Sequence, residues 1–241
     1  DLYNESIKVL SDMEDNPDGR ALKALAWNYY RKYEFGKSLE YANKAQQAGG
    51  VDDVIYRIKA SVYMGKGDYE LALENARKAV ELEETFYAYN IMGWTNFRMG
   101  NYDKAINNFN NSLNLRVHPS CESLNGFAWS LYMKGNKDDA RKVFTKAIQL
   151  PQDSKYEAKA HTGLAVLSME QGNMEEAYNH LKQALKIDPY YPYSKWVMAQ
   201  YYEENGNYKE ALKYMEKCLE SGFKYKRQEA IEYRDKIESQ L

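Results

Sequence analysis

Histidines and paired acidic residues are the side chains through which this sequence could ligate a metal or transfer a proton. None of the three histidines, His118, His161 and His180, has a Cys, Asp or Glu at a ligand spacing that recurs in the chain. Adjacent acids such as Glu83 and Glu84 are abundant, but on a helical surface such pairs are usually solvated charges. The sequence also contains no dinucleotide-binding or P-loop glycine motif and no Gly-x-Ser-x-Gly nucleophile elbow. We therefore expect no metal site, no cofactor, no catalytic residue and no enzymatic activity.

A stretch of about 17 residues recurs along the chain. The clear copies are GDYELALENARKAVELE, GNYDKAINNFNNSLNLR, GNKDDARKVFTKAIQL, GNMEEAYNHLKQALKIDP and GNYKEALKYMEKCLESG, and YEFGKSLEYANKAQQAGG is a more degenerate one. Each clear copy begins its apolar pattern with a small residue, at Ala72, Ala105, Ala140, Ala177 or Ala211. A second small residue follows seven positions later, on the same helix face, and a residue that is usually larger lies between them. This pattern predicts the core face of a helix that approaches its neighbours closely.

A second amphipathic segment precedes each copy and carries its own small residue, at Ala26, Ala60, Gly93, Ala128, Ala165 and Ala199. Each repeat is therefore predicted to be a helix, a short turn and a second helix. A glycine lies in the turn of five repeats, where a left-handed helix end suits this residue type, at Gly67, Gly100, Gly135, Gly172 and Gly206. The five prolines lie between predicted hairpins, where a missing N–H does not break a helix.

This pattern resembles the tetratricopeptide repeat family, whose units of about 34 residues place large, small and aromatic residues at fixed offsets. The first position of the family falls at Gly19, Asp53, Phe86, Cys121, Ala158 and Pro192. We therefore predict one array over residues 1–241 that consists of repeats 19–52, 53–85, 86–120, 121–157, 158–191 and 192–222. Residues 1–18 are expected to hold the second helix of a truncated or capping repeat, and residues 223–241 a polar capping helix.

The resemblance implies an all-α fold, an α-solenoid in which antiparallel helix pairs form a right-handed superhelix. The fourth, eighth and eleventh places of each first helix are then core positions. Three repeats depart from the family at the eleventh place, where Asn96, Leu131 and Ser168 replace the preferred aromatic residue. Family members that hold the C-terminal carboxylate of a chaperone use Asn at the ninth place, and this chain has none there. The chaperone-tail function is therefore not transferred to this chain.

The fifth, ninth and twelfth places of the first helices form a neighbouring stripe, about 100° round the helix. We expect this stripe to face away from the partner helix of its own hairpin, and the resemblance implies that it lines a concave binding surface. All four tryptophans lie on it. The predicted ligand-binding residues are Trp27, Tyr30, Arg57, Asn90, Trp94, Phe97, Arg98, Asn125, Trp129, Tyr132 and Trp196. The alternative is that these rings pack between adjacent first helices and stabilise the array.

Charge and hydropathy restrict the kinds of partner. Lys and Arg number 33 against 35 Asp and Glu, so no excess of positive charge favours nucleic acid. Apolar stretches are far shorter than the roughly 20 residues that span a bilayer, so we expect no membrane insertion. Basic residues of the predicted groove cluster in the first three repeats and acidic ones, such as Glu122 and Glu170, in the later repeats. Such a groove could orient an extended peptide.

We therefore predict a scaffold that binds another protein or a peptide in an aromatic groove. One alternative is a peptide-sensing regulatory module of a larger protein. The other is a glycan-binding groove, because stacked aromatic rings beside Asn also suit sugars. A cytoplasmic location and a monomeric state are expected.

Overall fold

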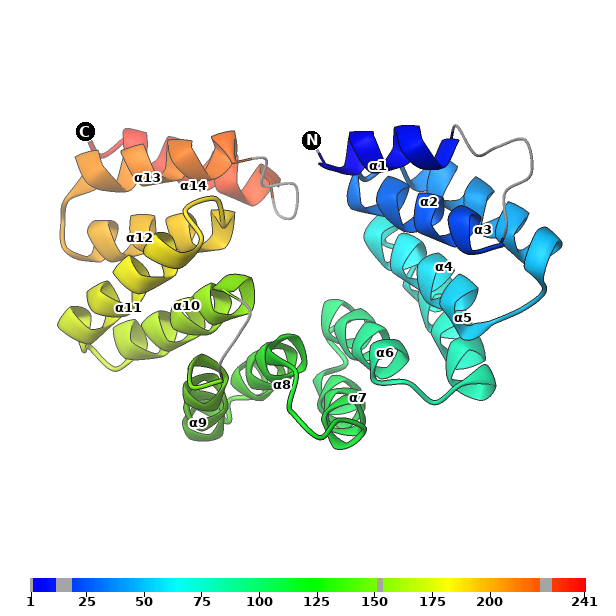
Figure 1. The fold of residues 1–241 in the computed structure, drawn as a ribbon. Helices are drawn as coiled ribbons and strands as arrows, with labels where there is room; N and C mark the ends of the chain where they lie inside the picture. The colour runs from blue at the N-terminus through cyan, green and yellow to red at the C-terminus, as the bar shows by residue number, and fades with distance from the viewer. Residues whose placement is uncertain (1, 12–18, 151–153, 222–226) are drawn as a thin grey trace. The chain divides into compact units, whose positions relative to one another are not determined.

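The computed structural model describes residues 2–11, 19–150, 154–221 and 227–241. In these ranges the chain forms α-helices and no strand (Figure 1). The contacts between residues divide the chain into two compact bodies, an N-terminal body of residues 1–119 and a C-terminal body of residues 120–241. The predicted all-α fold is confirmed. The division into individual repeats stays a prediction, and the two bodies are described separately below.

The N-terminal body contains three helical hairpins preceded by one further helix. Its helices are α1 (Leu2–Ser11), α2 (Gly19–Arg31), α3 (Phe35–Gly49), α4 (Asp53–Lys66), α5 (Tyr69–Leu82), α6 (Phe86–Arg98) and α7 (Tyr102–Asn114). Helices α2 and α3, α4 and α5, and α6 and α7 pack as pairs, and α3 and α5 each also contact the first helix of the next pair. The first helices α2, α4 and α6 contact one another in sequence as well. Each pair therefore buries its apolar face partly against the following pair.

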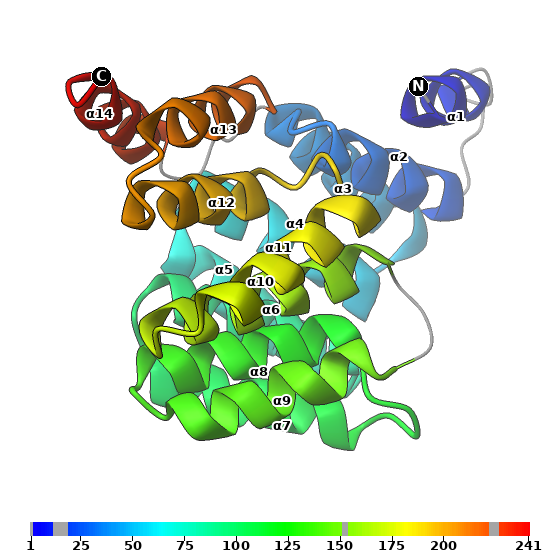
Figure 2. The same cartoon turned by 90° about the vertical axis from the view of Figure 1, so that its left-hand side faces the viewer.

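The C-terminal body repeats this arrangement and ends on a single helix. Its helices are α8 (Cys121–Met133), α9 (Lys137–Ile148), α10 (Ser154–Glu170), α11 (Met174–Ile187), α12 (Pro192–Glu204), α13 (Tyr208–Glu220) and α14 (Arg227–Glu238). Figure 2 shows α12 beside α13, and α14 contacts α13. The first helices start at the predicted first positions in five of the six hairpins, and α10 starts at Ser154, before Ala158.

Helix α1 packs against the first hairpin. The side chain of Ile7 contacts the buried cluster that contains Leu22 and Leu25, and the Asn28 amide donates a hydrogen bond to the Ser6 hydroxyl at 2.9 Å. The sequence predicts this helix over residues 2–14 with Ile7 and Leu10 on its apolar face. Residues 12–14 and the side chain of Leu10 lie outside the described part of the chain.

The core is made of small residues that face large ones. The alanines predicted to begin each apolar pattern, Ala72, Ala105, Ala140, Ala177 and Ala211, are all fully buried. So are the larger residues four positions later in the last four of these helices, Phe109, Phe144, Leu181 and Met215. The predicted core stripe of the second helices is therefore confirmed. Helices can approach closely there because a methyl group on one helix faces a ring or a long side chain on the next.

The turns inside the hairpins share one backbone pattern. Five turns contain a glycine with a positive φ, between 71° at Gly206 and 88° at Gly67, and in the turn between α2 and α3 Tyr33 takes this place with a φ of 61°. The residue after this position donates its N–H to the carbonyl at the eleventh place of the repeat, as Asn173 does to Ser168 at 2.8 Å. This bond is the signature of a Schellman helix end. Because it uses only backbone atoms, the turn forms equally well at Asn96, Leu131 and Ser168, where the family's aromatic residue is missing.

Two glycines inside first helices leave room for a fully buried phenylalanine of a second helix. A Cβ atom on Gly163 would lie 2.4 Å from Cζ of Phe144, and one on Gly93 would lie 2.6 Å from Cε1 of Phe109. Both phenylalanines are fully buried, so neither ring has space to move. The absence of a side chain at these two glycines is therefore a packing requirement.

We predict that Gly163→Ala lowers the free energy of unfolding by about 1–3 kcal/mol, because the added methyl group overlaps the Phe144 ring. This loss opposes the gain of about 1 kcal/mol that alanine normally brings inside a helix. Urea denaturation followed by circular dichroism measures the difference. Gly36→Ala is the matched control, since no atom lies within 4 Å of its added Cβ, and it should not reduce stability. A Gly163→Ala variant as stable as the parent would show that the ring is free to move.

Candidate binding surface

The first helices of three hairpins carry the same pair of aromatic rings. In each pair a tryptophan at the ninth place meets an aromatic residue three positions later, edge to face. The centroid distances and interplanar angles are 5.6 Å and 75° for Trp27 and Tyr30, 5.6 Å and 80° for Trp94 and Phe97, and 5.4 Å and 89° for Trp129 and Tyr132. All six side chains are half-buried. Each pair therefore presents part of its rings to solvent from a rigid helix.

The inner edges of these rings rest on the core. Trp94 meets Phe109 at 5.3 Å, and Trp129 meets Phe144 at 5.2 Å, both at steep angles. Phe109 and Phe144 belong to the second helices of the same hairpins, so the expectation that the stripe faces away from its own partner helix is wrong for Trp94 and Trp129. The reason is the size of the phenylalanines, whose rings reach past the small eighth place to the tryptophan beside it. These two rings thus pack on their own hairpins and stay partly exposed, and their role in ligand binding stays a prediction.

Residues at the fifth place connect several first helices to the next first helix of the same body. Lys23 forms an ion pair with Asp52, the residue that caps α4. Arg57 lies 4.8 Å from the ring of Tyr87 on α6, while its Nε donates to Asp53 at 2.7 Å. In the C-terminal body, the hydroxyls of Thr162 and Ser194 share a buried hydrogen bond of 2.7 Å between α10 and α12.

The predicted groove residues Asn90 and Asn125 are buried. The Asn125 amide donates to the carbonyls of Cys121 and Tyr156, at 2.8 and 3.0 Å, and so ties α8 to the first turn of α10. Its Oδ1 atom has no hydrogen-bond partner within the described residues. Burial leaves these two amides little surface to offer a ligand, and the bonds of Asn125 give it a role in stacking.

The fourth predicted tryptophan, Trp196, is covered by the last helix. Its ring lies 5.7 Å from that of Tyr233 on α14, with an angle of 9° between the planes. The Tyr233 hydroxyl donates to the carboxylate of Glu203, which also pairs with Lys236 at 2.7 Å. Burial, and then the bond to Glu203, raises the pKa of Tyr233. Trp196 is half-buried, but its ring is used for packing the end of the array.

Tyr132 is held in place by an acidic partner. Its hydroxyl donates to Glu170 at 2.6 Å, and Lys137 pairs with the other carboxylate oxygen at 3.0 Å. Burial and the bond to Glu170 raise the pKa of Tyr132. The Trp129 ring also meets Tyr193 at 5.8 Å, so the aromatic surface of α8 extends to α12. Rings from α8, α9 and α12 thus surround Trp129.

Charge is unevenly shared between the first helices of the two bodies. Helices α2, α4 and α6 carry one acidic residue, Asp53, and seven basic ones, Arg20, Lys23, Arg31, Arg57, Lys59, Lys66 and Arg98. Helices α8, α10 and α12 carry the acids Glu122, Glu157, Glu170, Glu203 and Glu204 and only three lysines. Arg98 is exposed, and its Nη1 donates to the Met64 carbonyl at 3.3 Å.

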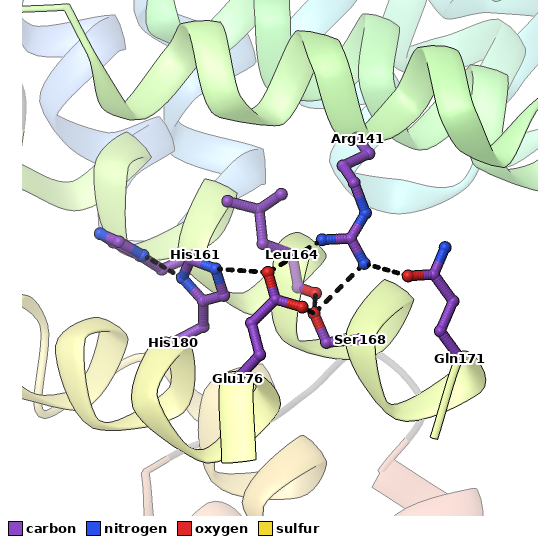
Figure 3. A network of polar contacts seen from close by, with 7 residues as sticks. All are labelled: Arg141, His161, Leu164, Ser168, Gln171, Glu176 and His180. Atoms are coloured by element: carbon purple, nitrogen blue, oxygen red, sulfur yellow. Dashed lines mark hydrogen bonds and ion pairs between the residues drawn. The ribbon is translucent and has the colours of Figure 1, made fainter. Parts of the chain in front are cut away.

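A polar network lies beside the apolar core in the hairpin of α10 and α11 (Figure 3). Arg141 of α9 reaches it and donates to Glu176, Ser168 and Gln171 at 3.2, 3.3 and 2.8 Å. The Ser168 hydroxyl lies 2.7 Å from Oε2 of Glu176, and this bond, followed by the charge of Arg141, holds the pKa of Glu176 below its usual value. The network joins two consecutive hairpins through charged groups.

Two histidines lie at the far end of this network. Nδ1 of His161 on α10 is 2.9 Å from Nδ1 of His180 on α11 (Figure 3). Burial lowers the pKa of both rings, that of His161 to about 4 with a further contribution from His180. The sequence analysis missed this pair because the residues are 19 positions apart on different helices. The available signal was the presence of polar residues, His161 and Ser168, at the fourth and eleventh core places of one repeat.

Comparison with known proteins identifies the repeats. Sequence models described as tetratricopeptide repeat match residues 55–86, 86–116, 125–192 and 168–230, which together are more than half of the chain. The chain belongs to the tetratricopeptide repeat family. The resemblance noted in the sequence and the solenoid fold that it implies are thereby confirmed.

Relatives of this tetratricopeptide repeat chain differ widely in size. A TPR repeat-containing protein of Methanocaldococcus jannaschii is 27% identical over 161 residues, which are 62% of this chain and 27% of that protein. The Cut9–Hcn1 structure of the APC/C contains a chain that superposes with a TM-score of 0.79 at 15% identity, over 96% of this chain and 46% of the other. A tetratricopeptide repeat protein from Parabacteroides merdae gives 0.75 at 19% identity, covering 96% and 98%. The chain thus spans about a quarter of the first relative and about half of the first structure.

We predict that Tyr233→Ala destabilises the tetratricopeptide array by about 2 kcal/mol, because it removes the ring stacked on Trp196 and the bond to Glu203. Chemical denaturation monitored by circular dichroism measures this change. Tyr190→Ala is the control, since the Tyr190 side chain is 80% exposed and its removal should be nearly neutral. Equal stability of the two variants would mean that α14 does not support the last hairpin.

Proposed function

We propose that this tetratricopeptide repeat chain is a protein-interaction scaffold that binds a segment of another protein through the aromatic pairs of its first helices. The observation that carries the proposal is the threefold recurrence of a half-buried tryptophan held edge to face by an aromatic residue. Trp and Tyr are the side chains that most often dominate the binding energy of protein interfaces. A ring already fixed by its neighbour loses little conformational freedom when a partner binds.

The family membership supports the same function. Arrays of helical repeats present extended surfaces, and these surfaces are the usual binding sites of such proteins. One chain of the APC/C hetero-tetramer Cut9–Hcn1 has a similar fold, and that structure is an assembly of different chains. Within the N-terminal body an extended peptide suits the surface better than a compact ligand, because the aromatic pairs lie on α2 and α6, and each of these helices contacts α4.

The surface divides into anchors and supports. The anchors are Trp27, Tyr30, Trp94, Phe97, Trp129 and Tyr132, with the exposed Arg98 beside them. The supports are Arg57, Asn90, Asn125 and Trp196, whose contacts or burial fix the first helices relative to one another within each body. The basic first helices of the N-terminal body favour acidic residues in the segment bound there.

No catalysis is included in the proposal. The raised pKa values of Tyr132, Tyr233 and Cys218 are explained by packing: the two half-buried tyrosines donate to carboxylates, and burial raises the pKa of the Cys218 thiol to about 11. No described helix is long and apolar enough to span a bilayer. The chain therefore acts, in this proposal, by holding a partner segment in place.

Selection of a displayed library of random peptides against the chain, followed by calorimetry of the selected peptide, tests the proposal. We expect Trp94→Ala or Trp129→Ala to weaken binding by about 30-fold, which corresponds to about 2 kcal/mol. Leu71→Ala is the control, because Leu71 is 43% exposed on a second helix, outside the proposed surface. Circular dichroism confirms that each variant is folded.

Two results would contradict the proposal. One is a selected peptide whose affinity is unchanged in variants of all three paired tryptophans, since it would then bind another surface. The other is a tryptophan fluorescence change with oligosaccharides but with no peptide, which would favour a glycan-binding groove.

A further inference from the structure

A continuous row of aromatic side chains crosses the C-terminal body. Its members, referred to here as the aromatic row, are Tyr132, Trp129, Tyr193, Tyr191 and Tyr156. Trp129 meets Tyr132 at 5.4 Å and Tyr193 at 5.8 Å, and Tyr193 meets Tyr191 at 6.4 Å. The Lys159 amine joins the last two rings, because it lies 4.6 Å from the centroid of Tyr156 and 5.7 Å from that of Tyr191. All five rings are half-buried, so each keeps part of its surface in solvent.

The row joins three hairpins into one surface. Trp129 lies on α8, Tyr156 on α10 and Tyr193 on α12, and α10 contacts both α8 and α12. The contact between Trp129 and Tyr193 therefore connects two first helices that flank a third. Tyr191 caps the start of α12 and extends the row beyond the helix. A segment bound along this row would contact the whole C-terminal body, although the repeat pattern predicted only Trp129 and Tyr132 as binding residues there beside Asn125 and Trp196.

The central rings of the row are fixed before any partner binds. Trp129 rests on Phe144 at 5.2 Å, and the Tyr132 hydroxyl donates to Glu170 at 2.6 Å. The first ring cannot move inward because Phe144 is fully buried. Rings held in this way lose little conformational freedom when they bind a ligand.

Charged groups at the two ends of the aromatic row cancel one another. Glu170, at one end, pairs with Lys137 at 3.0 Å. Lys159, at the other end, has its amine over two rings, and Asp188, three residues before Tyr191, accepts a backbone N–H at 3.0 Å. Each of these charged side chains already has a partner, and their charges sum to zero. Charge complementarity therefore favours a neutral occupant, unlike the acidic segment favoured by the first helices of the N-terminal body.

The hydrogen-bonding groups of the row narrow the choice of occupant. Trp and Tyr combine an apolar ring face with a donor at the ring edge, an indole N–H or a hydroxyl. A proline-rich segment complements both features. Its pyrrolidine rings are apolar, proline has no N–H that needs an acceptor, and the polyproline II conformation leaves the carbonyl oxygens without internal hydrogen bonds.

We propose that the aromatic row of the C-terminal body binds a proline-rich segment of a partner protein in the polyproline II conformation. Pyrrolidine rings pack on the faces of Trp129 and Tyr193, and ring-edge donors bind the carbonyl oxygens of the segment. Surfaces lined by aromatic side chains are the general means by which proteins bind such segments, whose stiff conformation is formed before binding. The inference rests on the proposed function and specifies the chemistry of the partner for this body.

Calorimetric titration of the full chain with end-blocked octaproline tests the inference. We expect one bound peptide per chain, and no binding of an end-blocked Gly–Ser octapeptide. Affinity should change less than about 2-fold between about 0.05 and 0.5 M salt, because the contacts are uncharged. Trp129→Ala and Tyr193→Ala should each weaken binding by at least about 10-fold.

Two matched controls accompany these variants. Tyr190→Ala removes a neighbouring tyrosine that is 80% exposed and outside the row, and Trp94→Ala removes a paired tryptophan of the N-terminal body. Both should bind octaproline as the wild type does. If Tyr193→Ala is unfolded by circular dichroism, nuclear Overhauser contacts between ¹³C-labelled octaproline and the Trp129 indole of the wild type decide instead.

Several outcomes would overturn the inference. They are no binding of octaproline by the wild type, equal binding of the Gly–Ser peptide, unchanged affinity in a folded Tyr193→Ala variant, or loss of binding in Trp94→Ala. Binding of chitohexaose in place of octaproline would assign the row to sugars. A wild type that ignores octaproline but binds a peptide selected from the random library refutes the proline specificity alone. Failure of both peptides refutes the proposed function as well.

Discussion

Close packing between small and large residues at the helix crossings is the constraint on which the rest of the structure depends. Alanine or glycine on one helix allows a neighbouring backbone to approach, and a phenylalanine, leucine or methionine fills the space beside it. Where the small residue is Gly163, even one methyl group would overlap the Phe144 ring. This arrangement sets how far the tryptophans stand from the core. Trp129 rests on the outer side of the same ring and is therefore left partly exposed.

Contacts between successive first helices add a second level of order. They differ in chemistry from place to place: an ion pair at Lys23, a cation over a ring at Arg57 and a buried amide at Asn125. Their common effect is to fix one first helix against the next within each body. Side chains that appear in the sequence as candidates for ligand contact thus hold the surface in shape, while the ninth and twelfth places provide its exposed rings.

Features that occur in every repeat could be predicted from the sequence, because several copies of the repeat show the same pattern. The buried alanines, the left-handed glycines and the all-α fold recur at fixed intervals, so errors in one copy are corrected by the others. Exposure could not be predicted in this way. Asn90 and Trp94 lie on one predicted stripe, yet one is buried and the other half-exposed, because helix axes cross at angles that spacing does not encode. The pairing of His161 with His180 joins different helices and occurs only once, so no repetition reveals it.

The hairpin turn has a consequence for how such a chain can vary. Its bond runs from the backbone N–H after the glycine to the backbone carbonyl at the eleventh place, and it ignores the side chain there. That side chain is free to drift from an aromatic ring to serine, provided that neighbouring helices supply compensating groups, as Arg141 and Glu176 do for Ser168. Each hairpin can in this sense vary independently of the others. The interior side chains of one hairpin can therefore change from apolar to polar while the repeat length, and with it the spacing of the helices, stays the same.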